Sequence, residues 1–128
     1  MKGLAPMKDF YHLNYPAENV FQCCVDLIRE IPQSENLIIM PEIATIYVQL
    51  INYPINYFCK GFMKDKLALN IKVDRTEEQK CNITISSGLL VEYPINYSGQ
   101  MEGRVLHAVA HFLYCLLGRL NYLYPPRQ

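Results

Sequence analysis

The chain has 128 residues, the size of one domain, and its twelve basic residues balance twelve acidic ones. Hydrophobic residues make up 51% of the sequence and charged residues 19%, which excludes a disordered or low-complexity chain. The even balance provides no basic stripe for a phosphate backbone, which argues against nucleic acid as a partner. No stretch reaches the roughly 20 apolar residues that a membrane span needs. We therefore expect one domain over residues 1–128, without a membrane span.

The beginning of the chain predicts a short strand and then a helix. Residues 1–7 hold a glycine and a proline, and we expect a loose lead-in there. Alternating side chains over residues 8–14 predict a strand. Residues 17–31 predict an amphipathic helix, because Pro16 suits its first turn and Pro32 ends it. Its apolar residues recur on one face: Val20, Phe21, Cys24, Leu27, Ile28 and Ile31.

The middle of the chain predicts six β-like segments, at residues 37–40, 43–51, 57–63, 67–73, 80–86 and 89–91. Pro41 separates the first two. The fourth and fifth segments alternate cleanly between apolar and polar side chains, and the polar residues between them predict the turn of an antiparallel hairpin. The pair Ser87-Gly88 is expected to break the fifth segment from the sixth.

Residues 99–122 predict the longest element, a helix with Ser98 as its N-cap. A wide apolar stripe follows the helical period: Val105, Leu106, Val109, Phe112, Leu113, Leu116, Leu117 and Leu120. Prolines 125 and 126 stop the helix, and residues 124–128 form a C-terminal tail. Such a stripe can cover the apolar face of an antiparallel sheet.

The order of the predicted elements is strand, helix, about five or six antiparallel strands and a long C-terminal helix, which predicts an α+β fold. This order resembles the helix-grip arrangement of START-like and Bet v 1-like proteins, in which a curved sheet wraps a long terminal helix. The resemblance implies a cavity between sheet and helix, small in a chain of this length. A smaller cone-like α+β fold, or another sheet with a terminal helix, fits the same order.

Four Tyr-Pro pairs stand at predicted element boundaries, and two of them belong to a pentapeptide, YPINY, that occurs at residues 53–57 and 93–97. The other two pairs are Tyr15-Pro16 and Tyr124-Pro125. Proline favours extended geometry before it, and tyrosine can keep its ring on the core with its hydroxyl in water. We interpret the pairs as structural boundaries. If the YPINY copies lie together, they form an aromatic rim of Tyr53, Tyr57, Tyr93 and Tyr97.

Three side chains with metal-binding chemistry recur four residues apart on the C-terminal helix: His107, His111 and Cys115. Histidines at i and i+4 can share a metal ion. The zincin glutamate is missing at position 108, and no second ligand cluster lies nearby in sequence. The sequence has no P-loop, G-x-G-x-x-G, G-x-S-x-G or C-x-x-C, so we predict no cofactor. A metal site or enzyme centred on His107 and His111 is the weakest of three hypotheses.

Behind its apolar stripe the same helix carries a second face without Lys, Arg, Asp or Glu: His107, Ala110, His111, Tyr114 and Gly118. Aromatic faces low in charge mark interfaces. Our first hypothesis is a non-catalytic binding module, in which this face binds a protein partner or a second copy of the chain. The second hypothesis is a carrier of a small apolar ligand. Its pocket would lie between the sheet and the helix, lined by residues such as Ile46, Leu69, Ile83 and Leu113.

The cysteines indicate the compartment in which the chain works. Five are present, at positions 23, 24, 59, 81 and 115, and their odd count and irregular spacing predict free thiols. Free thiols indicate a reducing, intracellular compartment, either cytoplasm or nucleus. Adjacent cysteines rarely form a disulfide without strain, so we expect Cys23 and Cys24 to be packing residues.

Overall fold

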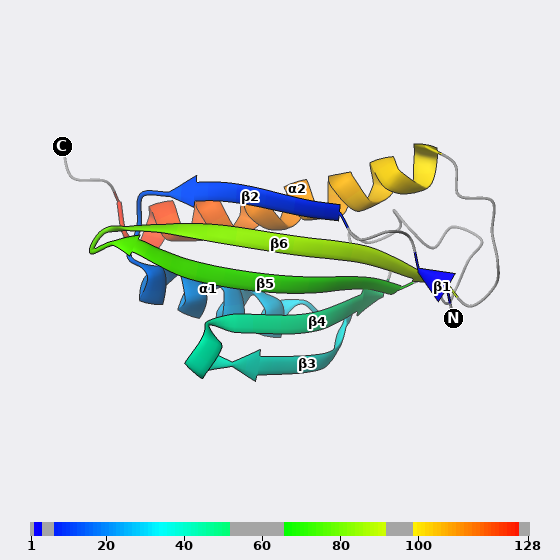
Figure 1. Cartoon of the computed structure of the whole chain (residues 1–128), viewed down its shortest axis with the longest axis horizontal. Helices are drawn as coiled ribbons and strands as arrows, with labels where there is room; N and C mark the ends of the chain where they lie inside the picture. Colours follow the sequence, from blue (N-terminus) through cyan, green and yellow to red (C-terminus); the bar gives the residue numbers. More distant parts are fainter. Residues whose placement is uncertain (1, 4–6, 52–65, 92–98, 126–128) are drawn as a thin grey trace.

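The computed structural model describes residues 2–3, 7–51, 66–91 and 99–125. Both helices lie on the same face of one antiparallel sheet (Figure 1). The elements are β1 (Lys2–Gly3), β2 (Met7–Leu13), α1 (Ala17–Glu30), β3 (Ser34–Met40), the 3₁₀ turn η1 (Pro41–Ile43), β4 (Thr45–Ile51), β5 (Lys66–Glu77), β6 (Lys80–Val91) and α2 (Gly99–Leu123). The predicted α+β class, with an antiparallel sheet and a long C-terminal helix, is confirmed. The strand predicted at residues 57–63 lies outside the described residues.

The sheet has six strands in the order β1-β6-β5-β4-β3, and β2 also pairs with β6. β2 and β1 lie one after the other along the same side of β6, β2 against residues 81–87 and β1 against residues 90–91. The structure therefore differs from the expected lead-in, because residues 2–3 form β1 and Met7 begins β2. β6 has twelve residues, which is long enough to supply backbone partners to both short strands.

β5 and β6 form the predicted hairpin, and their alternation decides which side chains face the helices. The inward side chains are buried: Leu67, Leu69, Ile71, Val73, Cys81, Ile83 and Ile85. Both strands are longer than predicted, since β5 runs to Glu77 and β6 continues through Ser87 and Gly88. The predicted break at Ser87-Gly88 is wrong, because these two residues pair with Leu69 and Ala68 of β5 and keep their place in the ladder.

β3 is an irregular edge strand at the opposite side of the sheet from β2. Its register against β4 shifts between Glu35 and Ile38, and Asn36 takes a left-handed φ of 54°, which asparagine tolerates. After η1, Ala44 takes a φ of 48°. The strand predicted from residue 43 therefore begins at Thr45, because η1 and this left-handed residue first turn the chain.

α1 confirms the predicted amphipathic helix. Its buried residues are Val20, Cys23, Cys24, Val25 and Ile28. The carbonyl of Pro16 accepts hydrogen bonds from the backbone N–H groups of Asn19 and Val20, both at 3.1 Å. The helix ends one residue before the predicted end, because Ile31 takes the extended geometry that Pro32 requires of the residue before it.

α2 packs against α1 and β6. Its buried residues are Val105, Ala108, Val109, Phe112, Leu113, Leu116 and Leu120. The stripe predicted from the sequence also includes Leu106 and Leu117, but these are 50% and 42% exposed, because α1 and β6 cover a narrower face. Arg119 Nη2 donates to Glu30 Oε1 at 2.6 Å and so joins the two helices. Within the described segments, no helix is long and apolar enough to cross a membrane.

Candidate functional site

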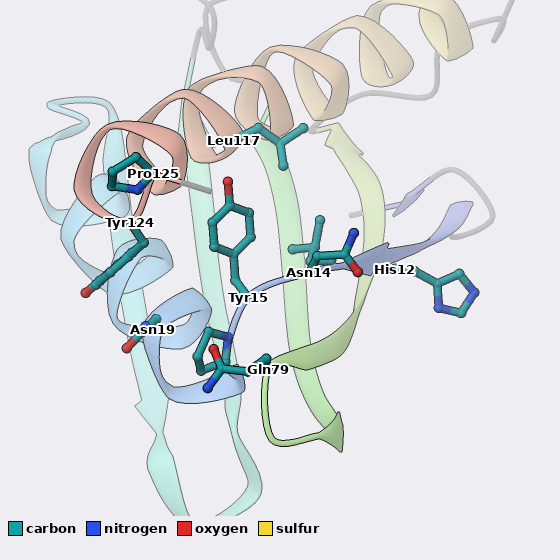
Figure 2. Close-up of a pocket in the computed structure, with 10 residues that line it drawn as sticks. His12, Asn14, Tyr15, Asn19, Gln79, Leu117, Tyr124 and Pro125 are labelled. Atoms are coloured by element: carbon teal, nitrogen blue, oxygen red, sulfur yellow. The ribbon is translucent and has the colours of Figure 1, made fainter. Parts of the chain in front are cut away.

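A cavity of about 600 Å³ lies where β2 passes into α1, and we call it the end cavity (Figure 2). Three parts of the chain form it: the segment from β2 into α1, the turn between β5 and β6, and the C-terminal end of α2. Its lining residues are His12, Leu13, Asn14, Tyr15, Pro16, Asn19, Gln79, Leu117, Tyr124 and Pro125. The site therefore joins residues from both ends of the sequence.

The turn from β2 into α1 places Tyr15 at the centre of the end cavity. Leu13 is buried at the end of β2, and Pro16 immediately precedes the helix. Only Asn14 and Tyr15 separate them, so the chain must reverse over very few residues. The ring of Tyr15 is partly buried against the core. Figure 2 shows it standing between Gln79 and Leu117, with its hydroxyl group toward α2.

The end of α2 supplies the opposite wall. Leu117 projects from the last turns of the helix, and its partial exposure comes from facing this cavity instead of the core. The backbone N–H of Tyr124 donates to the carbonyl of Leu120 at 2.8 Å, which holds the residue after the helix in a fixed position. Pro125 then prevents any further helical turn. Tyr124 is partly exposed, so its ring can contact a molecule in the cavity.

Five side chains that line the end cavity are amides or hydroxyls, which carry no formal charge at neutral pH. The side-chain amides of Asn14, Asn19 and Gln79 and the hydroxyls of Tyr15 and Tyr124 make no hydrogen bond within the described segments. None of the ten lining residues is Asp, Glu, Lys or Arg. Amides and hydroxyls both donate and accept hydrogen bonds, so they can orient a ligand that has no formal charge.

His12 lines the rim but is engaged elsewhere. Its Nδ1 lies 2.5 Å from Asn82 Oδ1, and its ring meets the ring of Phe10 edge-on at a centroid distance of 5.2 Å. Figure 2 shows the imidazole pointing away from Tyr15. The histidine is therefore held on the outer side of the sheet, away from the cavity interior.

Burial disfavours ionisation of three of the cysteine thiols. Burial raises the pKa of Cys81 to about 11, with a smaller contribution from the carboxylate of Glu18. Burial also raises the pKa of Cys23 and, more strongly, of Cys24. A thiol must ionise to act as a nucleophile or metal ligand, so these three side chains serve as packing residues at neutral pH. The prediction for Cys23 and Cys24 is confirmed, since both are buried and unbridged.

The structure brings together only two members of the predicted row on α2, which consists of His107, His111 and Cys115. Cys115 Sγ lies 4.0 Å from His111 Nδ1, the limit of a weak sulfur hydrogen bond. Among the described residues, no group of three or more His, Cys, Asp or Glu side chains is arranged to hold a metal ion. A metal site on His107, His111 and Cys115 therefore has no support in this part of the chain.

The other predicted sites fall in three different places. The interface residues on α2 are all exposed: His107, Ala110, His111, Tyr114 and Gly118. The predicted pocket residues belong to the buried core and do not line the end cavity: Ile46, Leu69, Ile83 and Leu113. The predicted aromatic rim lies outside the described residues: Tyr53, Tyr57, Tyr93 and Tyr97.

Sequence reasoning missed the end cavity as a site, although a signal for it was present. Two of the four Tyr-Pro pairs, Tyr15-Pro16 and Tyr124-Pro125, line this one cavity. Tyr15-Pro16 directly precedes α1 and Tyr124-Pro125 directly follows α2, so each of these two pairs lies at an element boundary, as predicted. The sequence does not show that the two boundaries meet, because the pairs lie near opposite ends of the chain and only the packing of α2 on the sheet brings them together.

The fold is that of helix-grip proteins. Ara h 8.0201 superimposes with a TM-score of 0.62 at 10% identity, over 91% of this chain and 97% of that protein. Norcoclaurine synthase from Thalictrum flavum, solved with dopamine and hydroxybenzaldehyde, gives 0.60 at 12% identity, over 96% and 89% of the two chains. A START superfamily protein from Mycobacterium smegmatis gives 0.55 at 11%, over 92% and 98%.

These likenesses confirm the resemblance that the element order indicates. No protein-family model matches the sequence, and no curated protein matches it. At these low identities, the comparisons show the fold alone.

Proposed function

We propose that this chain binds a small, uncharged and mainly apolar molecule in the end cavity. The observation that carries the proposal is the meeting of two Tyr-Pro pairs around a cavity whose amides and hydroxyls have no partner in the described segments. Binding sites for small molecules combine apolar walls with a few polar groups that fix orientation. The cavity volume of about 600 Å³ lies within the usual range for such sites.

The composition of the lining defines the class of ligand. Tyr15, Tyr124 and Leu117 offer ring faces and an aliphatic side chain, which favour a flat apolar body. The amides of Asn19 and Gln79 suit a carbonyl or hydroxyl substituent. A charged group would lose its hydration without gaining an opposite charge among the lining residues, so ionic molecules are disfavoured.

The fold supports the same reading. Norcoclaurine synthase, which shares the fold, is solved with two small aromatic molecules, dopamine and hydroxybenzaldehyde. A helix-grip chain can therefore hold ligands of this size. We propose binding and not catalysis for this chain, because His12 points away from the cavity and the buried thiols stay protonated.

A matched pair of leucine variants tests the proposal. We expect the neutral apolar dye Nile red to bind the purified chain with a saturable rise in fluorescence. Leu117→Lys should weaken binding by about tenfold or more, because it places an unpaired charge against an apolar ligand. Leu106→Lys is the control, since Leu106 is exposed on the same helix three turns away and does not line the cavity.

Two results would count against the end cavity. One is the absence of saturable dye binding by the wild type. The other is an equal loss in Leu117→Lys and Leu106→Lys, which would place the dye on the outer surface of α2. Circular dichroism of each variant shows whether it is folded, and both substitutions are at exposed positions where the fold should tolerate lysine.

A second candidate function is self-association through the outer face of α2. The observation in its favour is an exposed surface with a large aromatic side chain, Tyr114, which is 78% exposed. Leu106 extends the same surface. Arg119 is the only charged residue among residues 105–123 of α2, and its guanidinium is bound to Glu30. A second copy of the chain would bury this surface, and the matching prediction is argued in the Discussion.

A further inference from the structure

A second concave site lies between α1 and the edge strand β3, and we call it the α1–β3 groove. Its volume is about 510 Å³. Its lining residues are Ala17, Glu18, Phe21, Gln22, Val25, Arg29, Ile39, Pro41, Ala44 and Val73. It shares no lining residue with the end cavity, so the two sites can be tested separately.

The floor of the groove is apolar because α1 leaves part of the inner sheet face uncovered. Val25 and Val73 are buried beneath it, and Phe21 and Ile39 are only partly buried against the core. β3 lies at the edge of the sheet, and α1 contacts β5 more than it contacts β3 (Figure 1). An aliphatic chain lying on this floor would remove both partly buried side chains from water, which is favourable.

The groove is long and carries opposite charges at positions far apart along α1. Glu18, Gln22, Val25 and Arg29 recur at helical spacing, so they share one face of the helix. Eleven residues separate Glu18 from Arg29, a rise of about 16 Å along the axis. A linear molecule fits such a groove better than a round one.

As far as the described residues show, the guanidinium of Arg29 can bind an anion. Within the described segments its side chain makes no ion pair or hydrogen bond. The neighbouring carboxylate of Glu30 is held by Arg119 instead. Arginine binds carboxylates through two parallel hydrogen bonds, and such charge-assisted hydrogen bonds are stronger than those between neutral groups. Glu18, far along the same face, would repel a second negative charge.

We infer that the α1–β3 groove binds a linear amphipathic molecule with a single carboxylate, its head on Arg29 and its apolar chain on Phe21 and Ile39. This site is separate from the proposed function, which concerns an uncharged ligand in the end cavity. The charge of the two ligand classes distinguishes the sites. The groove holds Arg29, which makes no ion pair within the described residues, whereas the residues that line the end cavity include no Asp, Glu, Lys or Arg.

Decanoate is the probe for the groove, with calorimetric titration as the measurement. The wild type should bind it saturably. Arg29→Gln should weaken binding by about tenfold, because it removes a charge-assisted hydrogen-bond pair. Lys72→Gln, which removes a positive charge from the outer face of β5, is the matched control and should leave the affinity unchanged. Decanol, which lacks the carboxylate, should bind wild type and Arg29→Gln equally.

Three outcomes would overturn the inference. These are no saturable decanoate binding, equal affinities for wild type and Arg29→Gln, and a changed decanoate affinity in Leu117→Lys. The last would place the carboxylate ligand in the end cavity. Conversely, if Nile red fails to bind but decanoate binding depends on Arg29, the groove stands while the proposed function falls.

Discussion

At the scale of single residues, burial decides the chemistry of the thiols. Cys23, Cys24 and Cys81 are almost completely buried, and burial raises the pKa of each one. Cys115 is only partly buried on α2. A thiolate forms readily only where water or a cation can stabilise it, and a reagent must also reach the sulfur, so burial protects Cys23, Cys24 and Cys81 from reaction on both counts.

We expect iodoacetamide at neutral pH to modify Cys115 in the native protein while Cys23, Cys24 and Cys81 react only after denaturation. Peptide mapping by mass spectrometry places Cys59, Cys81 and Cys115 on separate peptides, so Cys59, outside the described residues, is scored separately. The adjacent Cys23 and Cys24 share one peptide, and fragmentation of that peptide assigns a modification to one or the other. Cys115→Ser is the control, and it should leave the protection of the three buried thiols unchanged. Native-state modification of Cys24 at the rate of Cys115 would contradict the assignment.

At the scale of elements, residues of α2 that are close in sequence lie on opposite faces of the helix, one in the core and the other at the surface. Phe112 is fully buried, whereas Tyr114, two residues later, is 78% exposed. Both are aromatic residues near the middle of the same helix. Their contrast is set entirely by what lies opposite, which is the sheet and α1 for Phe112 and solvent for Tyr114 in the described structure.

Removing each ring should therefore have very different effects on stability. Phe112→Ala should lower the free energy of unfolding by about 3–5 kcal/mol, because it leaves a cavity in the core. Tyr114→Ala should change it by no more than about 0.5 kcal/mol. Urea denaturation at a fixed protein concentration gives both values. Similar losses for the two variants would show that Tyr114 is also packed, which would favour the association discussed below.

The strands show how far alternation in the sequence predicts structure. The inward faces of β5 and β6 follow directly from alternating side chains such as Leu69 and Ile83. Strand ends do not, because Ser87-Gly88 breaks the pattern locally but is held by partners on β5. The same applies to the left-handed Ala44, whose conformation no alternation indicates.

The helices and the end cavity show a second limit on what sequence patterns can predict. Periodicity predicts that α2 has an apolar face but not its width, since Leu117 belongs to the stripe by spacing and to the end cavity by position. The Glu30–Arg119 pair joins residues 89 positions apart in the sequence. Contacts of this kind depend on how the two helices pack on the sheet, and no local pattern of either helix contains that information.

At the scale of the whole molecule, the self-association proposed for the outer face of α2 can be tested by sedimentation. We expect the wild type to sediment as a dimer. Tyr114→Glu and Ala110→Glu should each sediment as a monomer, because a buried, unpaired carboxylate opposes association. Asn70→Glu, on the outer face of β5, is the control and should behave like the wild type. Monomeric wild type, or dimeric glutamate variants, would exclude this interface.

The pairing of β2 with β6 also has a consequence for the order of folding. His12 and Asn82, which face each other across these strands, lie 70 positions apart. The hairpin of β5 and β6 needs only local contacts, whereas β2 can join the sheet only after β6 exists. Long-range pairing of this kind slows folding, because the loop must close before the contact forms. During synthesis, β2 would leave the ribosome before β3, β4, β5 and β6 yet be among the last of these strands to pair in the sheet.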